Sequence, residues 1–251
     1  MDEALPKKAR ATPADQAPET TAPARSAAAR FFGAVTAIAR KDLAAELRSR
    51  ELFSAMMVFS LLVIVIFNFA LELDISTRRS VTAGVLWVTF AFAGTLGLNR
   101  SLSAEKEQGC IDGLLLAPVD RASIYFGKAI SNLVFMMIVE AIVLPVYAFL
   151  YGVNLLNAGL LAVILLGSIG YTAVGTLLAT MSVQTRTREV LLPILLFPVI
   201  LPVLIAAVKA SGGILTGADQ ATIWPWLNLL IVYDVIFVAV AFMTFEYVVQ
   251  E

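Results

Sequence analysis

Two carboxylates within long hydrophobic stretches, Glu140 and Asp234, are the residues of this chain best placed to do chemistry. Counted at about 1.5 Å per helical residue from Lys128 and from Glu246, each lies about 18 Å along its helix, close to the middle of a bilayer. Ionisable side chains at such a depth are candidates for function, and no lysine or arginine lies at the same depth to pair with them. Three roles stay open for them: a polar contact between helices, a substrate or gating pathway, and exposure to lipid.

The rest of the chain offers little for catalysis. It has no histidine and a single cysteine, Cys110, which excludes Ser–His chemistry, His-ligated metal or haem, and an intrachain disulfide. A nucleotide-binding P-loop needs G-x-x-x-x-G-K-[ST]. The nearest match, at Gly127–Lys128, has Ala122 in place of the first glycine and Ala129 in the last position. We therefore expect a non-catalytic protein that holds no metal, no covalently bound cofactor and no ATP of its own.

Composition places the two carboxylates in a membrane protein. Of the 251 residues, 59% are hydrophobic and 15% are charged, whereas soluble domains average about 45–50% and about 25%. A net charge of -1 gives no basic face for nucleic acid. Apolar stretches of about 20 residues cross a bilayer as helices, which satisfy their own backbone hydrogen bonds. We predict an all-α integral membrane protein with six transmembrane helices, near residues 52–71, 81–98, 129–151, 158–180, 190–208 and 226–248.

Basic residues in the connections predict the orientation of the spans. Nine lie before the first span, four in 99–128 and two in 182–189, which places fifteen of the 18 lysines and arginines on one side. Cytoplasmic connections carry this excess. Both termini are therefore predicted to be cytoplasmic.

Three prolines, Pro193, Pro198 and Pro202, lie in the fifth span. Each removes a backbone donor, so we expect this span to be kinked. A broken or re-entrant fifth span is the alternative, and it would move the C-terminus to the opposite side of the membrane.

The N-terminal region divides into two parts. Residues 1–30 combine four prolines with alanine, threonine and charged residues, a composition typical of a disordered tail. Residues 31–51 carry apolar residues on one helical face and a basic cluster, which predicts an interfacial helix leading into the first span. An ordinary charged flank of that span is the alternative. The six-span permease domain is expected to cover residues 31–251.

The connection 99–128 contains the most informative pattern. Acidic residues open a short amphipathic segment, 103–116, which suits the positive end of a helix dipole. Apolar residues at i, i+3 and i+4 then form one face, and a proline ends the segment. The residues concerned are Glu105, Glu107, Gly109, Ile111, Asp112, Leu114, Leu115 and Pro118. Such a helix either docks in a groove of a cytoplasmic partner or simply lies at the membrane surface.

Four sequence runs carry a resemblance to known proteins. The pattern of 105–119, continued by Gly127–Lys128, resembles the loop between the second and third spans of type-2 ABC exporter permeases. LRSREL (47–52), LLPILLFPVILPVLIAAV (191–208) and VYDVIF (232–237) are similar to the haem exporter protein B (CcmB) family of cytochrome c maturation. The resemblance covers about residues 36–248.

The resemblance implies a function and a set of partners. It implies a permease-like bundle whose loop 99–128 is the coupling helix to a separate ATP-binding subunit (CcmA-like). It also implies a CcmC-like haem-handling subunit, a small CcmD-like membrane protein, and haem as a possible substrate. Two rivals stay open: a type-2 permease that exports a polysaccharide, lipid or drug, and a proton-coupled secondary transporter that uses Glu140 and Asp234.

Overall fold

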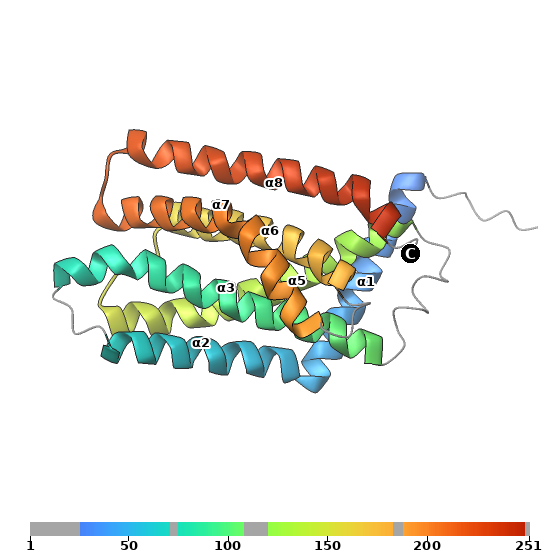
Figure 1. Ribbon diagram of the computed structural model, residues 1–251, viewed down its shortest axis with the longest axis horizontal. Helices are drawn as coiled ribbons and strands as arrows, with labels where there is room; N and C mark the ends of the chain where they lie inside the picture. The colour runs from blue at the N-terminus through green and yellow to red at the C-terminus, as the bar shows by residue number, and fades with distance from the viewer. Residues whose placement is uncertain (1–25, 71–74, 108–119, 183–187, 249–251) are drawn as a thin grey trace, which may run out of the picture.

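The structure is a computed structural model, and it describes residues 26–70, 75–107, 120–182 and 188–248. These ranges contain seven α-helices and no strand, so the predicted all-α class is confirmed (Figure 1). The helices are α1 (Ala27–Ser49), α2 (Glu51–Ala70), α3 (Ile75–Glu107), α5 (Arg121–Tyr151), α6 (Ala158–Ser182), α7 (Arg188–Thr216) and α8 (Gln220–Val248).

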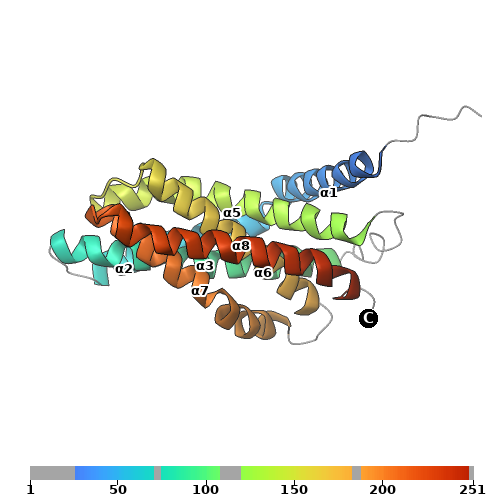
Figure 2. The same cartoon turned by 90° about the horizontal axis from the view of Figure 1, so that it is seen from above.

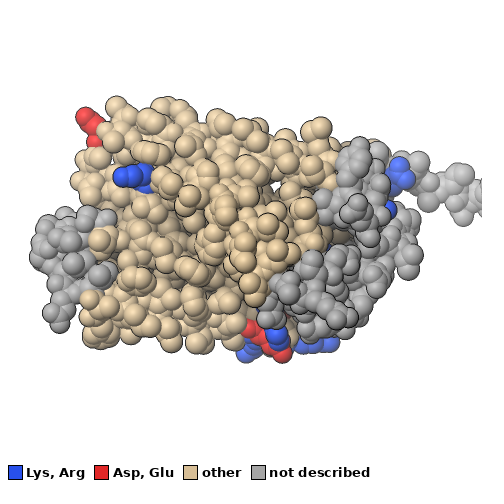
Figure 3. Space-filling view, in the orientation of Figure 1, with Lys and Arg blue, Asp and Glu red and all other residues tan. Residues whose placement is uncertain are grey.

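Six of these helices are long and apolar enough to cross a membrane, as predicted. The apolar windows run over 51–70, 81–101, 121–151, 158–182, 190–216 and 220–244. On the face shown in Figure 3, an uncharged belt separates charged side chains at the two ends of the molecule. An integral membrane bundle follows from this arrangement, because a belt of this kind matches the hydrocarbon of a bilayer.

The fifth span is one helix rather than a broken or re-entrant segment. All three of its prolines lie inside α7, and the helix visibly changes direction along its length (Figure 1). A proline in a helix removes one hydrogen bond and pushes away the carbonyl four residues earlier. The hydroxyl of Tyr233 on α8 donates to the carbonyl of Val199, next to Pro198, at 2.8 Å, and this bond fastens α8 to the bent region.

Helices α3 and α6 form the centre of the bundle. The apolar window of α3 is 72% buried and that of α2 only 22%, so α2 lies at the edge. Close approach to α6 depends on glycine, because a Cβ on Gly167 would lie 2.2 Å from the ring of Trp87 on α3. Small residues allow helices in lipid to pack at such short distances. Close packing of a small residue against a large ring therefore helps to hold α3 and α6 together.

Helix α1 lies across one end of the bundle and packs against the first turns of α5 (Figures 1 and 2). It begins at Ala27, capped by the side chain of Ser26, so residues 27–30 of the predicted tail are helical. Residues 1–25 of that tail lie outside the described ranges. Arg50 ends α1 in the left-handed conformation, with φ 57°, and α2 begins at the next residue. A one-residue turn therefore redirects the chain into the first span.

Candidate functional site

The predicted coupling segment is only partly described. Helix α3 continues to Glu107, so Glu105 and Glu107 belong to the end of α3 and not to the start of a separate helix. The other predicted residues of this segment lie in 108–119, outside the described residues: Gly109, Ile111, Asp112, Leu114, Leu115 and Pro118. The described elements on either side of this segment are the end of α3 and the start of α5.

Helix α5 begins at Arg121, shortly after the segment 108–119. Its first residue follows Asp120, whose carboxylate accepts a hydrogen bond from the backbone N–H of Ala122 at 3.1 Å, as an N-cap does. At 31 residues, α5 is about 47 Å long, well over the roughly 30 Å of hydrocarbon. About 17 Å of α5 is therefore in excess, and the predicted span 129–151 places this excess at the first turns, which carry Gly127 and Lys128.

Helix α1 docks on these first turns of α5 at Gly127. A Cβ there would lie 2.7 Å from the Cβ of Ile38 and 3.2 Å from the carbonyl oxygen of Val35. Only glycine permits this approach, because real Cβ contacts do not become so short. Phe31 and Phe126 add an edge-to-face contact with ring centroids 6.1 Å apart. We call this contact between α1 and the first turns of α5 the α1–α5 joint.

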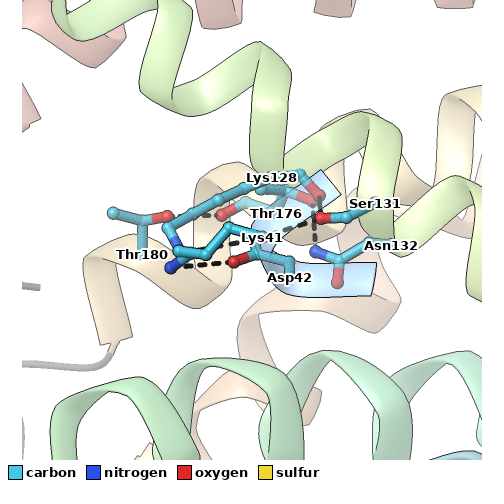
Figure 4. Close-up of polar contacts among 7 residues, drawn as sticks. All are labelled: Lys41, Asp42, Lys128, Ser131, Asn132, Thr176 and Thr180. Carbon is cyan, nitrogen blue, oxygen red and sulfur yellow. Dashed lines mark hydrogen bonds and ion pairs between the residues drawn. The ribbon is translucent and has the colours of Figure 1, made fainter. Parts of the chain in front are cut away.

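A buried ion pair completes the α1–α5 joint (Figure 4). The side chain of Lys128 is only 7% exposed, and its Nζ lies 3.9 Å from Oδ2 of Asp42 on α1. The same oxygen accepts a hydrogen bond from Ser131 at 3.3 Å, and Lys41 Nζ lies 2.9 Å from Oδ1. A buried ammonium is costly to desolvate unless an opposite charge and hydrogen bonds compensate. Asp42 supplies that compensation, so α1 and α5 are held together by charge as well as by packing.

Two further hydrogen bonds extend the α1–α5 joint to neighbouring helices. Asn132, one residue beyond Ser131, donates to the hydroxyl of Thr176 on α6 at 3.0 Å (Figure 4). At the other end of α1, the carboxylate of Glu46 accepts from the backbone N–H of Phe53 at 2.9 Å, which satisfies a free donor in the first turn of α2. Through α1, the joint thus reaches α2, and through α5 it reaches α6.

Glu140 lies at mid-span on α5 and faces α6. It is 1% exposed, and Oε1 accepts a hydrogen bond from the hydroxyl of Ser168 at 2.7 Å. Its second oxygen, Oε2, has no hydrogen-bond partner among the described residues. The observed contact is a polar link between α5 and α6, with one buried oxygen left over.

Asp234 faces the same turn of α6 from α8. It is 7% exposed, and neither carboxyl oxygen has a hydrogen-bond partner in the described part of the chain. A Cβ on Gly170 would lie 2.4 Å from Oδ1, so the glycine makes room for the carboxyl group. Ser168 and Gly170 are two residues apart, about 200° around the helix. The two carboxylates therefore contact α6 on opposite sides and do not form a pair.

The sequence analysis did not predict that Lys128 is buried or that it pairs with Asp42. Lys128 precedes the apolar run of its span, where a lysine ordinarily marks the membrane boundary. The available signal was the polar spacing of Lys128, Ser131 and Asn132 at i, i+3 and i+4, which places three polar groups on one face of α5. Across the described ranges, no group of three or more His, Cys, Asp or Glu residues is placed to hold a metal ion.

Comparison with known proteins gives a consistent result. A family model described as "CcmB protein" matches residues 33–250. The chain is 26% identical over 185 residues to "Heme exporter protein B" of Bradyrhizobium diazoefficiens, covering 73% of this chain and 83% of that protein. The protein of the same name from Paracoccus denitrificans is 27% identical over 187 residues, or 72% and 84% of the two chains. That from Rhodobacter capsulatus is 26% identical over 200 residues, or 74% and 92%.

Proposed function

This chain belongs to the CcmB protein family, and on that basis we propose that it is the permease subunit of an ATP-driven complex that handles haem for the assembly of c-type cytochromes. The family model covers nearly the whole of the described bundle, and relatives that match most of their own length are named "Heme exporter protein B". The six apolar helices supply the membrane-spanning part that such a subunit requires.

ATP hydrolysis is assigned to a separate CcmA-like subunit, which would dock on the connection 99–128. This chain lacks a P-loop, and a P-loop is the element whose backbone amides cradle the phosphates. The resemblance assigns the docking to the segment that contains Glu105, Glu107 and Gly109. A CcmC-like subunit would handle haem and a CcmD-like protein would join them, with both termini of this chain in the cytoplasm of a bacterium.

The observation that carries this mechanism is the α1–α5 joint. The segment 108–119 lies in the middle of the connection 99–128 and is followed by the first turns of α5, which are fastened to α1 by Gly127 and by the Asp42–Lys128 pair. A displacement of the connection by the CcmA-like subunit would therefore move α1 and the start of α5 together. From there the movement would pass to α6 through Asn132 and to α2 through Glu46.

Two versions of the haem step are compatible with this machinery. The complex either translocates haem or uses ATP to release haem already held by a partner, with this chain acting as a mechanical relay. The chain has no histidine, the side chain that holds haem iron from the proximal side in globins and peroxidases. We favour the relay, in which the CcmC-like subunit supplies the haem ligands.

The proposal is tested by co-expressing the chain with its candidate ATPase and a CcmC-like partner, purifying through this chain, and measuring ATPase activity and haem absorbance. The expected result is a complex that hydrolyses ATP and carries haem only when the CcmC-like partner is present. Replacing Glu105 and Glu107 by lysine should then abolish haem release while leaving the chain folded. An ATPase that copurifies without any haem protein would favour export of another substrate.

The buried carboxylates favour one second candidate, a proton-coupled secondary transporter. Three buried oxygens of Glu140 and Asp234 lack hydrogen-bond partners among the described residues, and intramembrane carboxylates of this kind occur in proton relays. Transport that depends on a proton gradient, in a preparation free of any ATPase, would establish this candidate. Dependence on ATP and a copurified ATPase would eliminate it.

A further inference from the structure

The charges of α1 are sorted by sign around the helix. Both of its acidic residues face the protein: Asp42 contacts Lys128 and Ser131, and Glu46 accepts from the first turn of α2. Of its four cations, Lys41 pairs with Asp42, whereas Arg30, Arg40 and Arg48 are exposed and none of these three forms an ion pair with a described residue. The acidic groups are thus used up inside the molecule, while the positive charge is left on its outside.

Helical geometry shows that the outer side of α1 consists of two strips. At about 100° per residue, the three arginines lie within about 80° of one another and opposite Val35, and Lys41, which pairs with Asp42, lies at the edge of the same side. We call the three arginines the basic strip. Beside it runs an apolar strip, Phe32, Leu43 and Leu47, of which Phe32 is 65% and Leu47 70% exposed. Leu43 is partly buried against the main core, so the apolar strip borders the bundle.

The position of α1 explains why an apolar strip is tolerated outside. The helix ends at Ser49 and the first span begins at Glu51, so its C-terminal end lies where the hydrocarbon begins. Its middle packs on the first turns of α5, in the part of that helix that exceeds the bilayer thickness. A helix at this level has protein on one side, acyl chains along the next side and lipid headgroups on the third. The three strips of α1 match these three environments in order.

We propose that the basic strip of α1 is a binding surface for anionic phospholipid headgroups. Three unpaired arginines complement the negative surface of a membrane leaflet, and guanidinium groups bind phosphate with two parallel hydrogen bonds. The neighbouring apolar strip inserts among the acyl chains, as in other interfacial helices.

The spacing along the strip indicates separate headgroup sites. Arg40 is ten residues from Arg30 and eight from Arg48, which is about 15 Å and about 12 Å along the helix axis. Over such distances the three guanidinium groups lie along successive stretches of the membrane surface. We therefore expect each arginine to add its own headgroup contact.

The test uses the full chain in vesicles and reads lipid composition next to α1. A tryptophan probe is introduced by Ala44→Trp, an exposed position between Arg40 and Arg48, with Trp224 and Trp226 replaced by phenylalanine. The third tryptophan, Trp87, is 1% exposed, and its emission is subtracted with the matched protein that lacks Ala44→Trp. Quenching by brominated phosphatidylglycerol is compared with quenching by brominated phosphatidylcholine. We expect a severalfold preference for the anionic lipid. Replacing Arg40 or Arg48 by glutamine should lower it by a factor of up to about five, on the scale of one basic residue at a membrane surface, whereas replacing Arg30, about 21 Å away along the helix, should change it less.

Matched variants make the result decisive. Lys209→Gln removes an exposed charge from α7, far from α1 in sequence and on another helix, and should leave the preference unchanged. Changing all three arginines to lysine should retain most of it, because the charge persists. On the unsubstituted strip, raising the salt concentration should bring the preference towards one, which tests the proposal even if the glutamine variants fail to insert. A preference that survives both high salt and the triple glutamine variant would overturn the proposal.

This binding surface does not depend on the proposed haem function. Quenching is measured with the chain alone, without an ATPase or haem. A failure of the lipid preference would leave the permease proposal intact, and a copurification without ATPase would leave the lipid surface intact. If the triple glutamine variant keeps the lipid preference in vesicles but no longer retains the ATPase in the copurification, the basic strip binds that protein and the lipid proposal is overturned.

Discussion

The α1–α5 joint and the middle of the bundle both bury ionisable groups, but they treat them differently. At the joint, the buried ammonium of Lys128 has the carboxylate of Asp42 beside it, and Ser131 donates to the same carboxylate. At mid-span, Glu140 has one donor for two oxygens, and Asp234 has none among the described residues. The buried charge at the joint is thus compensated by an opposite charge. The mid-span carboxyl groups, in contrast, have oxygens that can still accept hydrogen bonds or bind a proton.

This difference has a consequence for mutations. Removing one partner of a buried ion pair leaves the other charge stranded, which costs far more than losing the pair as a whole. Removing a group that has no partner strands nothing. The two regions should therefore separate clearly when single substitutions are compared by the free energy of unfolding in detergent micelles.

The largest effect is expected at the joint. Asp42→Leu leaves the Lys128 ammonium buried without its counter-charge and should destabilise the protein by about 3–5 kcal/mol, measured by denaturant titration in micelles. The matched control is the double variant Asp42→Leu with Lys128→Met, which removes both charges and should recover most of the loss. Equal losses in the single and double variants would contradict the pairing.

Close packing at the joint predicts the next largest effect. Gly127→Val places a Cβ where Ile38 and the backbone of Val35 already lie and should destabilise by about 2–3 kcal/mol through overpacking. Gly33→Val is the control on α1, since a Cβ there meets nothing within 4 Å. Its free energy of unfolding should stay within about 0.5 kcal/mol of the parent value. If the two valines cost the same, α1 does not approach α5 closely at Gly127.

The Glu140–Ser168 contact should give an intermediate effect. Ser168→Ala removes the only hydroxyl that donates to Glu140 among the described residues and should cost about 1–2 kcal/mol, because a buried acceptor loses its donor. Ser60→Ala serves as control, since that buried hydroxyl donates only to the carbonyl of Met56 on its own helix. Its cost should be smaller than that of Ser168→Ala in the same titration, and the reverse order would count against the contact.

The smallest effect is expected at Asp234. Asp234→Asn keeps the size of the side chain and breaks no hydrogen bond to a described residue, so the free energy of unfolding should change by less than about 0.5 kcal/mol. The comparison with Ser168→Ala is made in the same micelles. A loss above that of Ser168→Ala would show that the Asp234 carboxyl is compensated after all, and would remove the contrast between the two regions.

The sequence predicted the spans well, because hydrophobic length alone requires them. It also predicted that Glu140 and Asp234 lie deep in their spans, because depth follows from counting residues along a helix, and both lie well inside α5 and α8. It could not predict that both would contact α6, since this depends on how α5 and α8 are rotated about their axes. Spacing along one helix carries no information on that rotation.

The joint shows a different limit of the sequence. Lys128 beside an apolar run is ordinarily a boundary residue, and hydropathy treats a snorkelling lysine and a paired buried lysine alike. Its partner lies on α1, in a segment predicted to be interfacial without a stated docking surface. Long-range pairing of this kind is decided by tertiary contacts. The predicted role of Glu105 and Glu107 in coupling to an ATP-binding subunit stays a prediction, because residues 108–119 lie outside the described ranges.

The number of residues between the two halves of the joint also determines when α1 can dock during synthesis of the chain. Asp42 and Ser131 are 89 residues apart, and protein synthesis proceeds at about 5–20 residues per second, so α1 waits about 4–18 s for its partner helix to be made. During this interval two spans have been synthesised, while α1 has neither Gly127 nor Lys128 to dock against. Its arginines and exposed apolar strip allow α1 to bind the membrane surface until α5 has been synthesised. The last step in placing the N-terminal helix therefore depends on the synthesis of the third span.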